Sequence, residues 1–269
     1  MEGLNRHIKP HWKYSTPLEN RGVLIASDSN HEWMIPWWWY NYKQHNDYPV
    51  AIIDLGMSER AKKCCQKIGT VLNYDYHDVV IAPKEFVPDN LQAVYEKKFH
   101  IENFWKTRSA WFKKPFTMLQ SPFHTTIWMD IDCEVKDSLQ HLFETHECQP
   151  GFRIALEDEN SIAEWVKCGI VEKGEKIYNS GVIAYTHGHE IFIDWAKETM
   201  VNNHVASGSQ DTLRFVLRRK EHTILQLPNI YNWRMKKGKN PEAVIIHWVA
   251  DGGKSYISNQ IKSIFFTPE

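Results

Sequence analysis

The sequence TTIWMDID, residues 125–132, decides how the rest of the chain is interpreted, because an apolar, β-prone run ends there in two carboxylates. Successive side chains of an extended chain point to opposite faces, so we expect Asp130 and Asp132 to face the same way and Ile131 to point back into the core. A strand that delivers two carboxylates to its carboxyl end can hold a hard divalent cation against phosphate oxygens. The stretch therefore predicts a cation and phosphate site at one edge of a sheet.

Two other interpretations of the paired aspartates have to be weighed. A solvated acidic turn after a strand fits the bare spacing as well, since a D-x-D pattern in a chain of this length arises easily by chance. A calcium loop of the EF-hand type needs Gly and Glu at its sixth and twelfth positions, but counting from Asp130 these are Val135 and His141. The calcium loop is excluded, and the choice between the other two depends on context.

Composition and charge narrow the class of protein. With 269 residues, 42% of them hydrophobic, the chain can bury the core of one large or two small domains. Its 32 basic and 33 acidic residues give a net charge of -1, and without a basic excess nucleic acid is not expected as a partner. Residues 1–20 are polar and lack the apolar core of a signal peptide, and no later run could span a membrane. We expect a soluble protein, or at most one peripheral to a membrane.

The cysteines point to a reducing compartment. Their number is odd and no C-x-x-C pair occurs, so neither a disulfide framework nor a zinc knuckle is indicated. A cytoplasmic location fits this usage best. Cys133 directly follows the paired aspartates, and a small buried side chain is favoured there over a chemical role. The five cysteines are Cys64, Cys65, Cys133, Cys148 and Cys168.

Strand-like and helix-like segments alternate along the chain, which predicts βαβ units and a mostly parallel mixed sheet flanked by helices. We interpret residues 1–20 as an N-terminal extension and residues 21–269 as one α/β domain. The aromatic run 37–40 is expected to pack in the core rather than bind a ligand. Residues 83–98 are expected to be irregular. The expected strands are 22–26, 48–54, 69–73, the run ending at 129, 151–156, 181–185 and 244–248, and the expected helices are 35–42, 58–68, 107–120 with a break near Pro115, 190–202 and 209–219.

Two further segments place polar groups at the end or start of a strand. Asp28 follows the first strand, where a carboxylate can bind a base or ribose or can simply cap the next helix. Asn179 precedes Gly181 at the start of another strand; the amide offers donors and an acceptor to sugar hydroxyls, and the glycine suggests close backbone approach or a bulge. A plain Asn-Ser-Gly turn is the competing interpretation of that segment.

Two segments nearer the C-terminus carry similar signals. Ser209, Gln210 and Asp211 open a predicted helix, where Ser209 or Asp211 could also act as an N-terminal cap. His247 ends a β-prone run and can supply a neutral imidazole to a metal already held by carboxylates. The glycines 252 and 253 allow a loop to close over a ligand, and Lys254 can neutralise a pyrophosphate.

Together these segments resemble the retaining GT-A glycosyltransferases, most closely family eight, which includes glycogenin and the bacterial galactosyl- and glucosyltransferases of lipopolysaccharide synthesis. The motifs occur in the order known from that family and run from residue 23 to about residue 256. The resemblance implies a Rossmann-like GT-A domain. The matching pieces are IWMDID at 127–132, NSGVI at 179–183, QD-x-L at 210–213, LP-x-x-YN at 227–232, and His247 with the GGK at 252–254.

The resemblance also implies roles for individual residues. It implies that Asp130, Asp132 and His247 bind a divalent ion, Mn²⁺ or Mg²⁺, that holds the diphosphate of a nucleotide sugar. It implies catalytic positions for Gln210, Asp211 and Asn179, with Gln210 near the anomeric carbon on the face opposite the leaving group and Asn179 in contact with donor or acceptor sugar. The donor-binding residues that it implies are Ala26, Asp28, Arg108, Lys114, Asp130, Ile131, Gly252 and Lys254.

Two departures from the family pattern leave the sugar undetermined. Ser209 stands where the family usually has an aspartate that orients the donor sugar, and Ser255-Tyr256 replace the usual Pro-Trp that closes the final motif. Neither change touches the implied metal ligands. We therefore expect an enzyme, a hexosyltransferase, that moves a hexose from a nucleotide diphosphate sugar, UDP-sugar being expected, to a hydroxyl acceptor with retention. The acceptor would be a glycan, a lipid-linked sugar or a protein.

Other functions remain open at this stage. An inverting transferase would use a carboxylate as base, with Glu157, Asp158, Glu159 and Asp211 as candidates. A catalytically idle sugar- or partner-binding protein on the same fold is supported only by the two departures. A hydrolase needs two carboxylates but no metal clamp, and a nucleotidyltransferase needs a Gly-rich basic loop after the first strand, which is missing.

The basic and aromatic residues near the C-terminus raise the question of membrane contact. They could touch an anionic membrane that carries a lipid-linked acceptor. An exposed charged loop and a packed final strand are the favoured interpretation. The residues concerned are Lys236, Lys237, Lys239, Lys262, Phe265 and Phe266.

Overall fold

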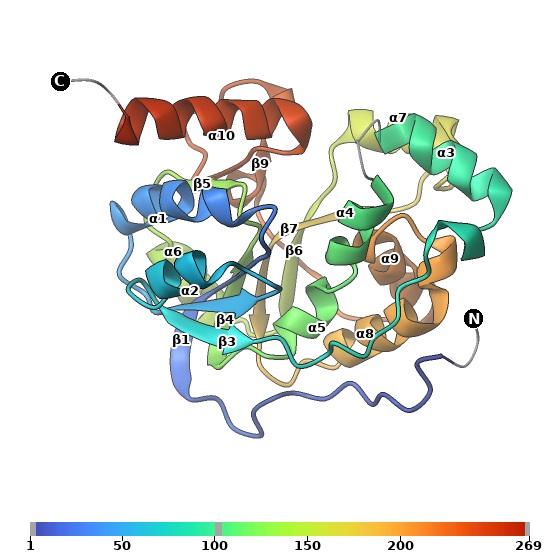
Figure 1. The fold of residues 1–269 in the computed structure, drawn as a ribbon, viewed down its shortest axis with the longest axis horizontal. Helices are drawn as coiled ribbons and strands as arrows, with labels where there is room; N and C mark the ends of the chain where they lie inside the picture. Colours follow the sequence, from blue (N-terminus) through green and yellow to red (C-terminus); the bar gives the residue numbers. More distant parts are fainter. Residues whose placement is uncertain (1–3, 100–103, 267–269) are drawn as a thin grey trace.

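A seven-stranded sheet of order β3-β2-β1-β4-β7-β6-β8 runs through the middle of the molecule, as the computed structural model shows (Figure 1). The structure describes residues 4–99 and 104–266. Residues 1–3 of the predicted N-terminal extension and residues 267–269 of the predicted domain lie outside the described part. Strands β1 to β4 are parallel to one another, and β7 is antiparallel to both of its neighbours. The strands are β1 (Glu19–Ser27), β2 (Val50–Asp54), β3 (Thr70–Asn73), β4 (Phe123–Met129), β6 (Phe152–Leu156), β7 (Tyr178–Thr186) and β8 (Leu225–Gln226).

Helices cover both faces of this sheet because its strands are apolar on both sides. Val23 and Ile25 of β1 belong to one core cluster and Leu24 to the other, so alternate side chains point to opposite faces. The first face packs against α1 (Ile35–Lys43), α2 (Glu59–Cys65), α6 (Gln140–Cys148) and α10 (Ala250–Phe265). The second packs against α5 (Lys114–Met118), α8 (Ile191–Asn202) and α9 (Ser209–Arg219).

A second, three-stranded sheet and a separate group of helices complete the described chain. The small sheet has the order β5-β10-β9, made of β5 (Cys133–Val135), β10 (Ile245–His247) and β9 (Trp233–Arg234). Its strand β5 follows β4 in the chain, directly after the paired aspartates. Helices α3 (Asp89–Phe99), α4 (Phe104–Trp111) and α7 (Glu159–Lys167) lie on the side of the molecule away from α1 and α2, as Figure 1 shows. In residues 4–99 and 104–266, five short 3-10 helices lie at 32–34, 84–86, 203–205, 229–231 and 235–237.

The predicted fold class is confirmed, and most of the predicted strands and helices occur within a few residues of their expected bounds. Ser58 caps α2 by accepting a hydrogen bond from the backbone N–H of Ala61 at 3.2 Å. Trp37 and Trp38 are buried in the core as expected, whereas Tyr40 at the end of the same run is exposed. The predicted helix 107–120 is two helices, α4 and α5, separated just before Pro115.

Two expectations about local structure are wrong, and one pair of alternatives is decided. Residues 83–98, expected to be irregular, contain most of helix α3, whose apolar side chains pack with Val87 and α4 in a small peripheral cluster. Of the two interpretations of the Asn-Ser-Gly segment at 179–181, the bulge is confirmed: the segment is part of β7, with a bulge opposite Ile154 and Ala155, and no separate turn forms there. The chain from Ala250 to Phe265 is helix α10, so neither a glycine loop nor a final strand forms there.

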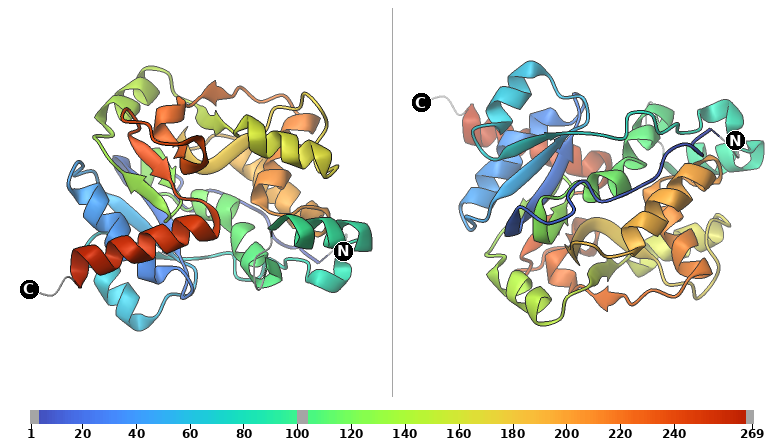
Figure 2. Two further views of the ribbon diagram at one scale, coloured as in Figure 1. Left: turned by 90° about the horizontal axis from the view of Figure 1, so that it is seen from above. Right: turned by 90° about the horizontal axis from the view of Figure 1, so that it is seen from below.

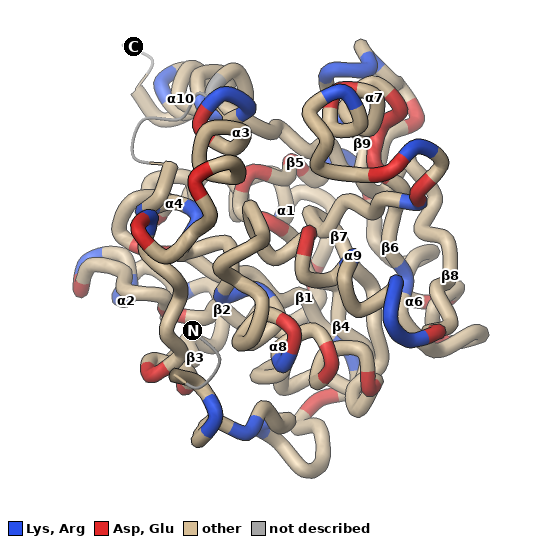
Figure 3. Tube along the Cα trace, turned by 90° about the vertical axis from the view of Figure 1, so that its right-hand side faces the viewer, with Lys and Arg blue, Asp and Glu red and all other residues tan. Residues whose placement is uncertain are grey.

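The surface carries both signs of charge, and Figure 3 shows lysine and arginine interspersed with aspartate and glutamate along the trace. No described helix is long and apolar enough to cross a bilayer. Lys236, Lys237, Lys239 and Lys262 are exposed, as are Phe265 and Phe266 at the end of α10. Seen from above, α10 extends from its C-terminal end at the edge of the molecule toward the middle (Figure 2). Its first residue, Ala250, lies near the carboxyl end of β4, because it lines the same cavities as Asp130.

Candidate functional site

Two cavities meet at the carboxyl end of β4, where an open α/β sheet is expected to bind its ligand. The first, which we call the Gln210 cavity, has a volume of about 260 Å³. The second, the Asp28 cavity, has a volume of about 200 Å³. Both are lined by the same junction residues, which are Trp111, Lys114, Asp130, Asp132 and Ala250. The paired aspartates thus lie between two spaces rather than in a solvated turn.

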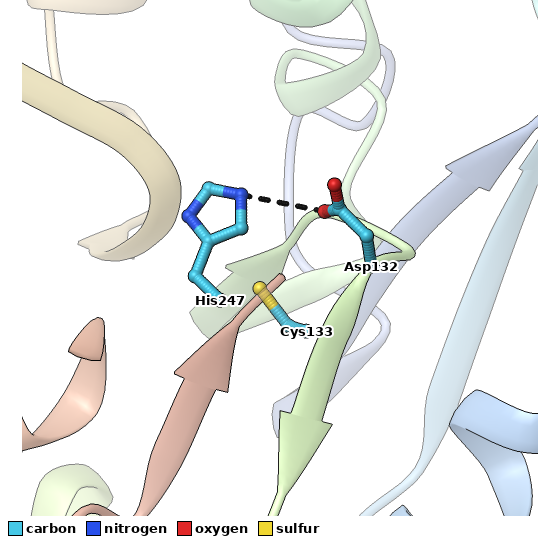
Figure 4. A group of neighbouring side chains, drawn as sticks. All are labelled: Asp132, Cys133 and His247. Atoms are coloured by element: carbon cyan, nitrogen blue, oxygen red, sulfur yellow. Dashed lines mark ion pairs between the residues drawn. The ribbon is translucent and has the colours of Figure 1, made fainter. Parts of the chain in front are cut away.

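The acid and imidazole groups singled out in the sequence converge at this junction. Strand β10 pairs antiparallel with β5, with His247 opposite Cys133, so Asp132 just before β5 meets the imidazole. Nε2 of His247 lies 3.3 Å from Oδ1 of Asp132 and 3.9 Å from Oδ2 of Asp130. Figure 4 shows the imidazole and the Asp132 carboxylate pointing toward one another from the ends of these two strands. Residues more than a hundred positions apart are therefore brought within contact distance.

The orientation of the imidazole is fixed by a buried hydrogen-bond chain. The side-chain amide of Asn232 donates to Oδ1 of Asn179 at 3.0 Å, which leaves its own oxygen to accept. Nδ1 of His247 lies 3.0 Å from that oxygen and therefore carries the proton. Nε2 then faces the carboxylates, the arrangement in which a second group orients a metal-binding histidine.

Close packing beneath the imidazole explains the glycine of the Asn-Ser-Gly segment. A Cβ atom at Gly181 would lie 2.1 Å from Cε1 and 2.3 Å from Nδ1 of His247. No side chain fits between the strand and the ring. The close backbone approach suggested by the sequence is therefore present, and its partner is His247.

Charge at the junction is balanced by opposing groups. Burial raises the pKa of Asp132, but the nearby His247 and then Lys114 outweigh it and hold the pKa below its usual value. Nζ of Lys114 contacts both oxygens of Asp130 at 2.8 Å and also donates to the carbonyl of Ser180 at 3.1 Å. The carboxylate of Asp132 is therefore ionised at neutral pH.

These groups fit a hard divalent cation. Two carboxylates and one imidazole lone pair form an oxygen-rich donor set of the kind that Mn²⁺ or Mg²⁺ accepts. The ligand atoms of Asp132, Cys133 and His247 lie within 4.8 Å of one another. Cys133 does not suit such an ion, because burial and then the two aspartates raise the pKa of its thiol, which donates to the carbonyl of Gly181 at 3.8 Å. The buried, unreactive role expected for Cys133 agrees with this contact.

The side-chain amide of Gln210 lies in the wall of the first cavity in a fixed orientation. Its oxygen accepts from the backbone N–H of Ser180 at 3.2 Å and its nitrogen donates to Oε2 of Glu157 at 3.4 Å. The same carboxylate oxygen accepts from Asn179 at 3.0 Å, and Oε1 pairs with Arg234. Both Asn179 and Gln210 are thus held by one buried glutamate.

Asp211 also lines the Gln210 cavity but its carboxylate is already engaged. Oδ2 accepts from the backbone N–H of Ser207 at 2.8 Å and from its hydroxyl at 2.5 Å, and Oδ1 lies 3.6 Å from Arg214. Asp211 thereby fixes the segment before α9 rather than capping the helix, which begins after Gly208 without a side-chain cap. Ser209 is buried and also lines this cavity.

The Asp28 cavity brings together the other donor-binding residues inferred from the sequence. Ala26, Asp28, Ile131 and Lys254 line it together with the junction residues. Oδ1 of Asp28 accepts from the backbone N–H groups of Asn30 and His31 at 3.1 and 3.0 Å, and it lies 2.7 Å from the His31 ring. Burial opposes this charge, but the hydrogen bonds from His31 and Asn30 lower the pKa of Asp28 to about 2. Asp28 therefore stabilises its own turn as well as facing the cavity.

Two inferred donor-binding residues are not brought into either cavity. Arg108 is 1% exposed, and its guanidinium donates to the backbone carbonyls of Ala82, Asn203 and Ala206, so the expectation of donor contact is corrected to an internal role. Gly252 lies exposed in the first turn of α10, where an added methyl group would meet no other atom within 4 Å. The expected donor contact of Gly252 depended on a glycine loop, and the chain forms helix α10 there instead.

Several residues of the site escape sequence reasoning. Asn232 is part of the LP-x-x-YN motif, yet its role behind His247 depends on two strands that meet only in the fold. Arg234 carries no local signal, and Glu157 was considered only as a possible base. Three others approach from helices on the far side of the cavity: Lys98, Trp111 and Trp165.

Comparison with known proteins shows what this fold is similar to. The sequence matches no family model and no curated protein. The galactosyltransferase LgtC, solved in complex with donor and acceptor sugar analogs, is similar with a TM-score of 0.57 at 16% identity, covering 92% of this chain and 98% of that chain. The bifunctional glycosyltransferase WbbM has a TM-score of 0.57 at 12% identity over 94% of this chain and 51% of its own.

A third solved structure extends the comparison to an animal protein. Mouse xyloside xylosyltransferase 1 has a TM-score of 0.52 at 12% identity, covering 85% of this chain and 97% of that chain. At these identities the likeness concerns the fold. The fold of this chain is therefore a GT-A-like glycosyltransferase fold, as the sequence resemblance predicted.

Proposed function

We propose that the protein is a metal-dependent hexosyltransferase that uses a nucleotide diphosphate sugar, UDP-sugar being expected, and a hydroxyl acceptor. The observation that carries the proposal is the convergence of Asp130, Asp132 and Nε2 of His247 at the junction of two cavities. One cavity would hold the nucleotide and the other the transferred sugar with its acceptor. The diphosphate, which connects nucleotide and sugar, would then lie at the junction beside the carboxylates.

The donor set at the junction fits Mn²⁺ or Mg²⁺. Asp130, Asp132 and His247 would hold the ion, with Asn232 orienting the imidazole. When bound there, the ion would neutralise the negative charge of the diphosphate. Lys114, at 2.8 Å from Asp130, lies where its ammonium would also face a phosphate oxygen.

The transfer step that we propose retains the anomeric configuration. The acceptor oxygen forms a bond to the anomeric carbon while the bond from that carbon to the diphosphate breaks, and the acceptor proton passes to the departing phosphate oxygen. The sugar becomes oxocarbenium-like, so a nearby lone pair stabilises it. The amide oxygen of Gln210, held by Ser180 and oriented by Glu157, would supply that lone pair without being titratable.

An inverting mechanism is the weaker alternative. It needs a carboxylate free to take the acceptor proton. Glu157 pairs with Arg234, and Asp158 caps α7 and also lies 2.9 Å from Arg234. Asp211 is engaged by Ser207 and Arg214, and Glu159 is exposed in α7 and lines neither cavity. The anomeric configuration of the product, measured from proton NMR coupling constants, separates the two mechanisms.

A thermal-shift panel tests the proposed donor and metal. UDP-, GDP- and CMP-sugars are each added with and without Mn²⁺, because a ligand that binds only the folded state raises the melting temperature. We expect UDP-sugars with Mn²⁺ to give the largest shift, equivalent to about 2.7 kcal/mol at a hundredfold excess over the dissociation constant. Slow release of free sugar and UDP from the same mixture would contradict a catalytically idle protein. A panel without any metal-dependent shift would contradict the proposal.

The acceptor could be presented at a membrane surface, which we include in the proposal as peripheral contact. The exposed lysines 236, 237, 239 and 262 and the exposed Phe265 and Phe266 support it. Co-sedimentation with vesicles that contain anionic lipid tests it. Equal recovery of protein with neutral and anionic vesicles would contradict it.

A further inference from the structure

Lys98 enters the Gln210 cavity from the last turn of α3 and is held there by aromatic rings. Its Nζ lies 3.9 Å from the ring centroid of Trp165 and 4.5 Å from that of Phe99. Contacts of this kind attract an ammonium group to the ring faces. They hold the ammonium in position but, unlike an ion pair with a carboxylate, bring no negative charge to compensate its positive charge.

The other charged side chains of this cavity already have partners, and Asp132 faces His247 at 3.3 Å. Lys114 pairs with Asp130, and the carboxylates of Glu157 and Asp211 are engaged by Arg234 and by Ser207. Among the described residues, no carboxylate lies within ion-pair distance of Lys98. Within the described part of the chain, its ammonium is therefore the cation of this cavity without an anionic partner.

This arrangement is unfavourable for the protein alone. Burial lowers the pKa of Lys98 from 10.5 to about 8, although Asp211 at longer range acts in the opposite direction. An anion placed beside the ammonium would remove that penalty. A partly desolvated lysine without a partner, facing a cavity, thus indicates a negatively charged ligand.

Its position separates Lys98 from the proposed diphosphate. Lys98 lines the Gln210 cavity and is absent from the lining of the Asp28 cavity, whose own lysine is Lys254. The junction lysine, Lys114, lies between them. The anion that meets Lys98 therefore belongs on the side of the molecule where the acceptor would enter.

We propose that the acceptor carries an anionic group, a phosphate or a carboxylate, which binds Lys98 beside Trp165. This inference rests on the proposed function and adds the chemical class of the acceptor. Trp165 and Phe99 act by holding the ammonium at the cavity wall. Lys98 would thus be an acceptor-binding residue that selects acidic sugars over neutral ones.

Matched pairs of neutral and acidic sugars test the proposal. Binding of galactose and galacturonate, and of glucose and glucose 6-phosphate, is measured by isothermal titration calorimetry of the full chain saturated with UDP and Mn²⁺. We expect the acidic member of at least one pair to bind about tenfold more tightly than the neutral member. Which acid is preferred distinguishes a carboxylate from a phosphate. Equal binding of both members, or no detectable binding of either acid, would overturn the proposal.

Two variants show whether Lys98 is responsible. Lys98→Gln is expected to lose about tenfold in affinity for the acidic sugar and less than twofold for the neutral one. Lys97→Gln changes the exposed neighbour on the same helix and is expected to leave both affinities unchanged. Equal losses for both sugars in Lys98→Gln would indicate a packing role and overturn the proposal. So would an increase in the KM for UDP-sugar in the hydrolysis reaction, because it would assign Lys98 to the donor.

The failure of this inference differs from a failure of the proposed function. A protein that hydrolyses UDP-sugar but binds neutral and acidic sugars equally contradicts only the inference. A protein that neither binds nor hydrolyses any nucleotide sugar in the presence of Mn²⁺ contradicts the proposed function, and the inference falls with it.

Discussion

The two cavities that meet at Asp130 are built in different ways. The Asp28 cavity is lined largely by the ends of β1 and β4 and by the segments next to them, as expected from βα units whose strands end at one edge. The Gln210 cavity combines segments far apart in the sequence, from α3 and α7 to β7, the start of α9 and β10. The first depends on local chain geometry, and the second depends on long-range pairing.

Buried polar groups hold the walls of the Gln210 cavity in place. Arg108 holds the backbone just before Ser207, and the Glu157–Arg234 pair holds Asn179 and Gln210. Such groups are costly to bury unless every partner is in place. We therefore expect the Gln210 cavity to be more sensitive to single substitutions than the Asp28 cavity. Four substitutions test this difference, in order of decreasing expected effect.

Asp132→Asn should affect both cavities at once, because Asp132 lies at their junction. It removes a charge from the proposed metal site while keeping the shape of the side chain. We expect metal-dependent turnover of UDP-sugar to fall by about a thousandfold or more, with the fold retained. Turnover is measured as UDP release across a Mn²⁺ titration.

A surface aspartate provides the control for this substitution. The side chain of Asp47 is 87% exposed, and Asp47→Asn should leave turnover and metal dependence unchanged. Normal Mn²⁺-dependent turnover in Asp132→Asn would refute the metal assignment.

Arg108→Met should weaken the wall of the Gln210 cavity from behind. It leaves three buried carbonyls, those of Ala82, Asn203 and Ala206, without their donor. We expect the free energy of unfolding to fall by about 3 kcal/mol, measured by urea denaturation. UDP binding by the surviving folded protein should change little, because Arg108 does not reach the Asp28 cavity. A large loss of UDP affinity without a loss of stability would restore the donor-contact role that the sequence suggested.

Gly181→Ala should displace the imidazole of His247, since the added methyl would lie 2.1 Å from its ring. We expect Mn²⁺ affinity to fall by about 10- to 100-fold, the range seen when the support of a metal ligand is lost. Isothermal titration with Mn²⁺ in the presence of UDP measures this change. Gly252→Ala is the matched control, because open space surrounds that position. Unchanged Mn²⁺ affinity in Gly181→Ala would exclude His247 from the ligand set.

Lys98→Met should increase stability slightly at neutral pH. The pKa of Lys98 falls from 10.5 in the unfolded chain to about 8 in the folded protein, so the unfolded chain binds more protons between these values. Stability therefore rises with pH across that window, and the penalty is complete below pH 8. We expect a gain of about 1 kcal/mol at pH 7, reduced by contact with cavity water and by the lost ring contacts.

Urea denaturation of wild type and Lys98→Met at several pH values measures this effect. The difference in the free energy of unfolding should be largest at pH 7 and should shrink as the pH approaches 10.5, the unfolded value. A loss of stability at every pH would show that the ring contacts outweigh the burial penalty.

The difference between the cavities also explains how much could be predicted. The strand that ends at Asp130, the helix cap at Ser58 and the first βα units depend on neighbouring residues, so periodicity and capping rules were sufficient for them. Helix α3 was missed because its apolar residues form only a small peripheral cluster with α4. Helix α10 was missed because two glycines in its first turn are typical of a loop.

The sequence by itself determined the alternating α/β pattern, the paired aspartates at a strand end and the order of the motifs, because these features depend on residues a few positions apart. Only the tertiary structure decided that Asn232 orients His247, that Arg108 holds a cavity wall instead of a ligand, and that Lys98 faces an open space where no described carboxylate pairs with it. Each of these depends on segments brought together by strand pairing and helix packing across long stretches of chain. Local sequence patterns do not show which distant segments meet, so the chemistry of the Gln210 cavity becomes visible only in the fold.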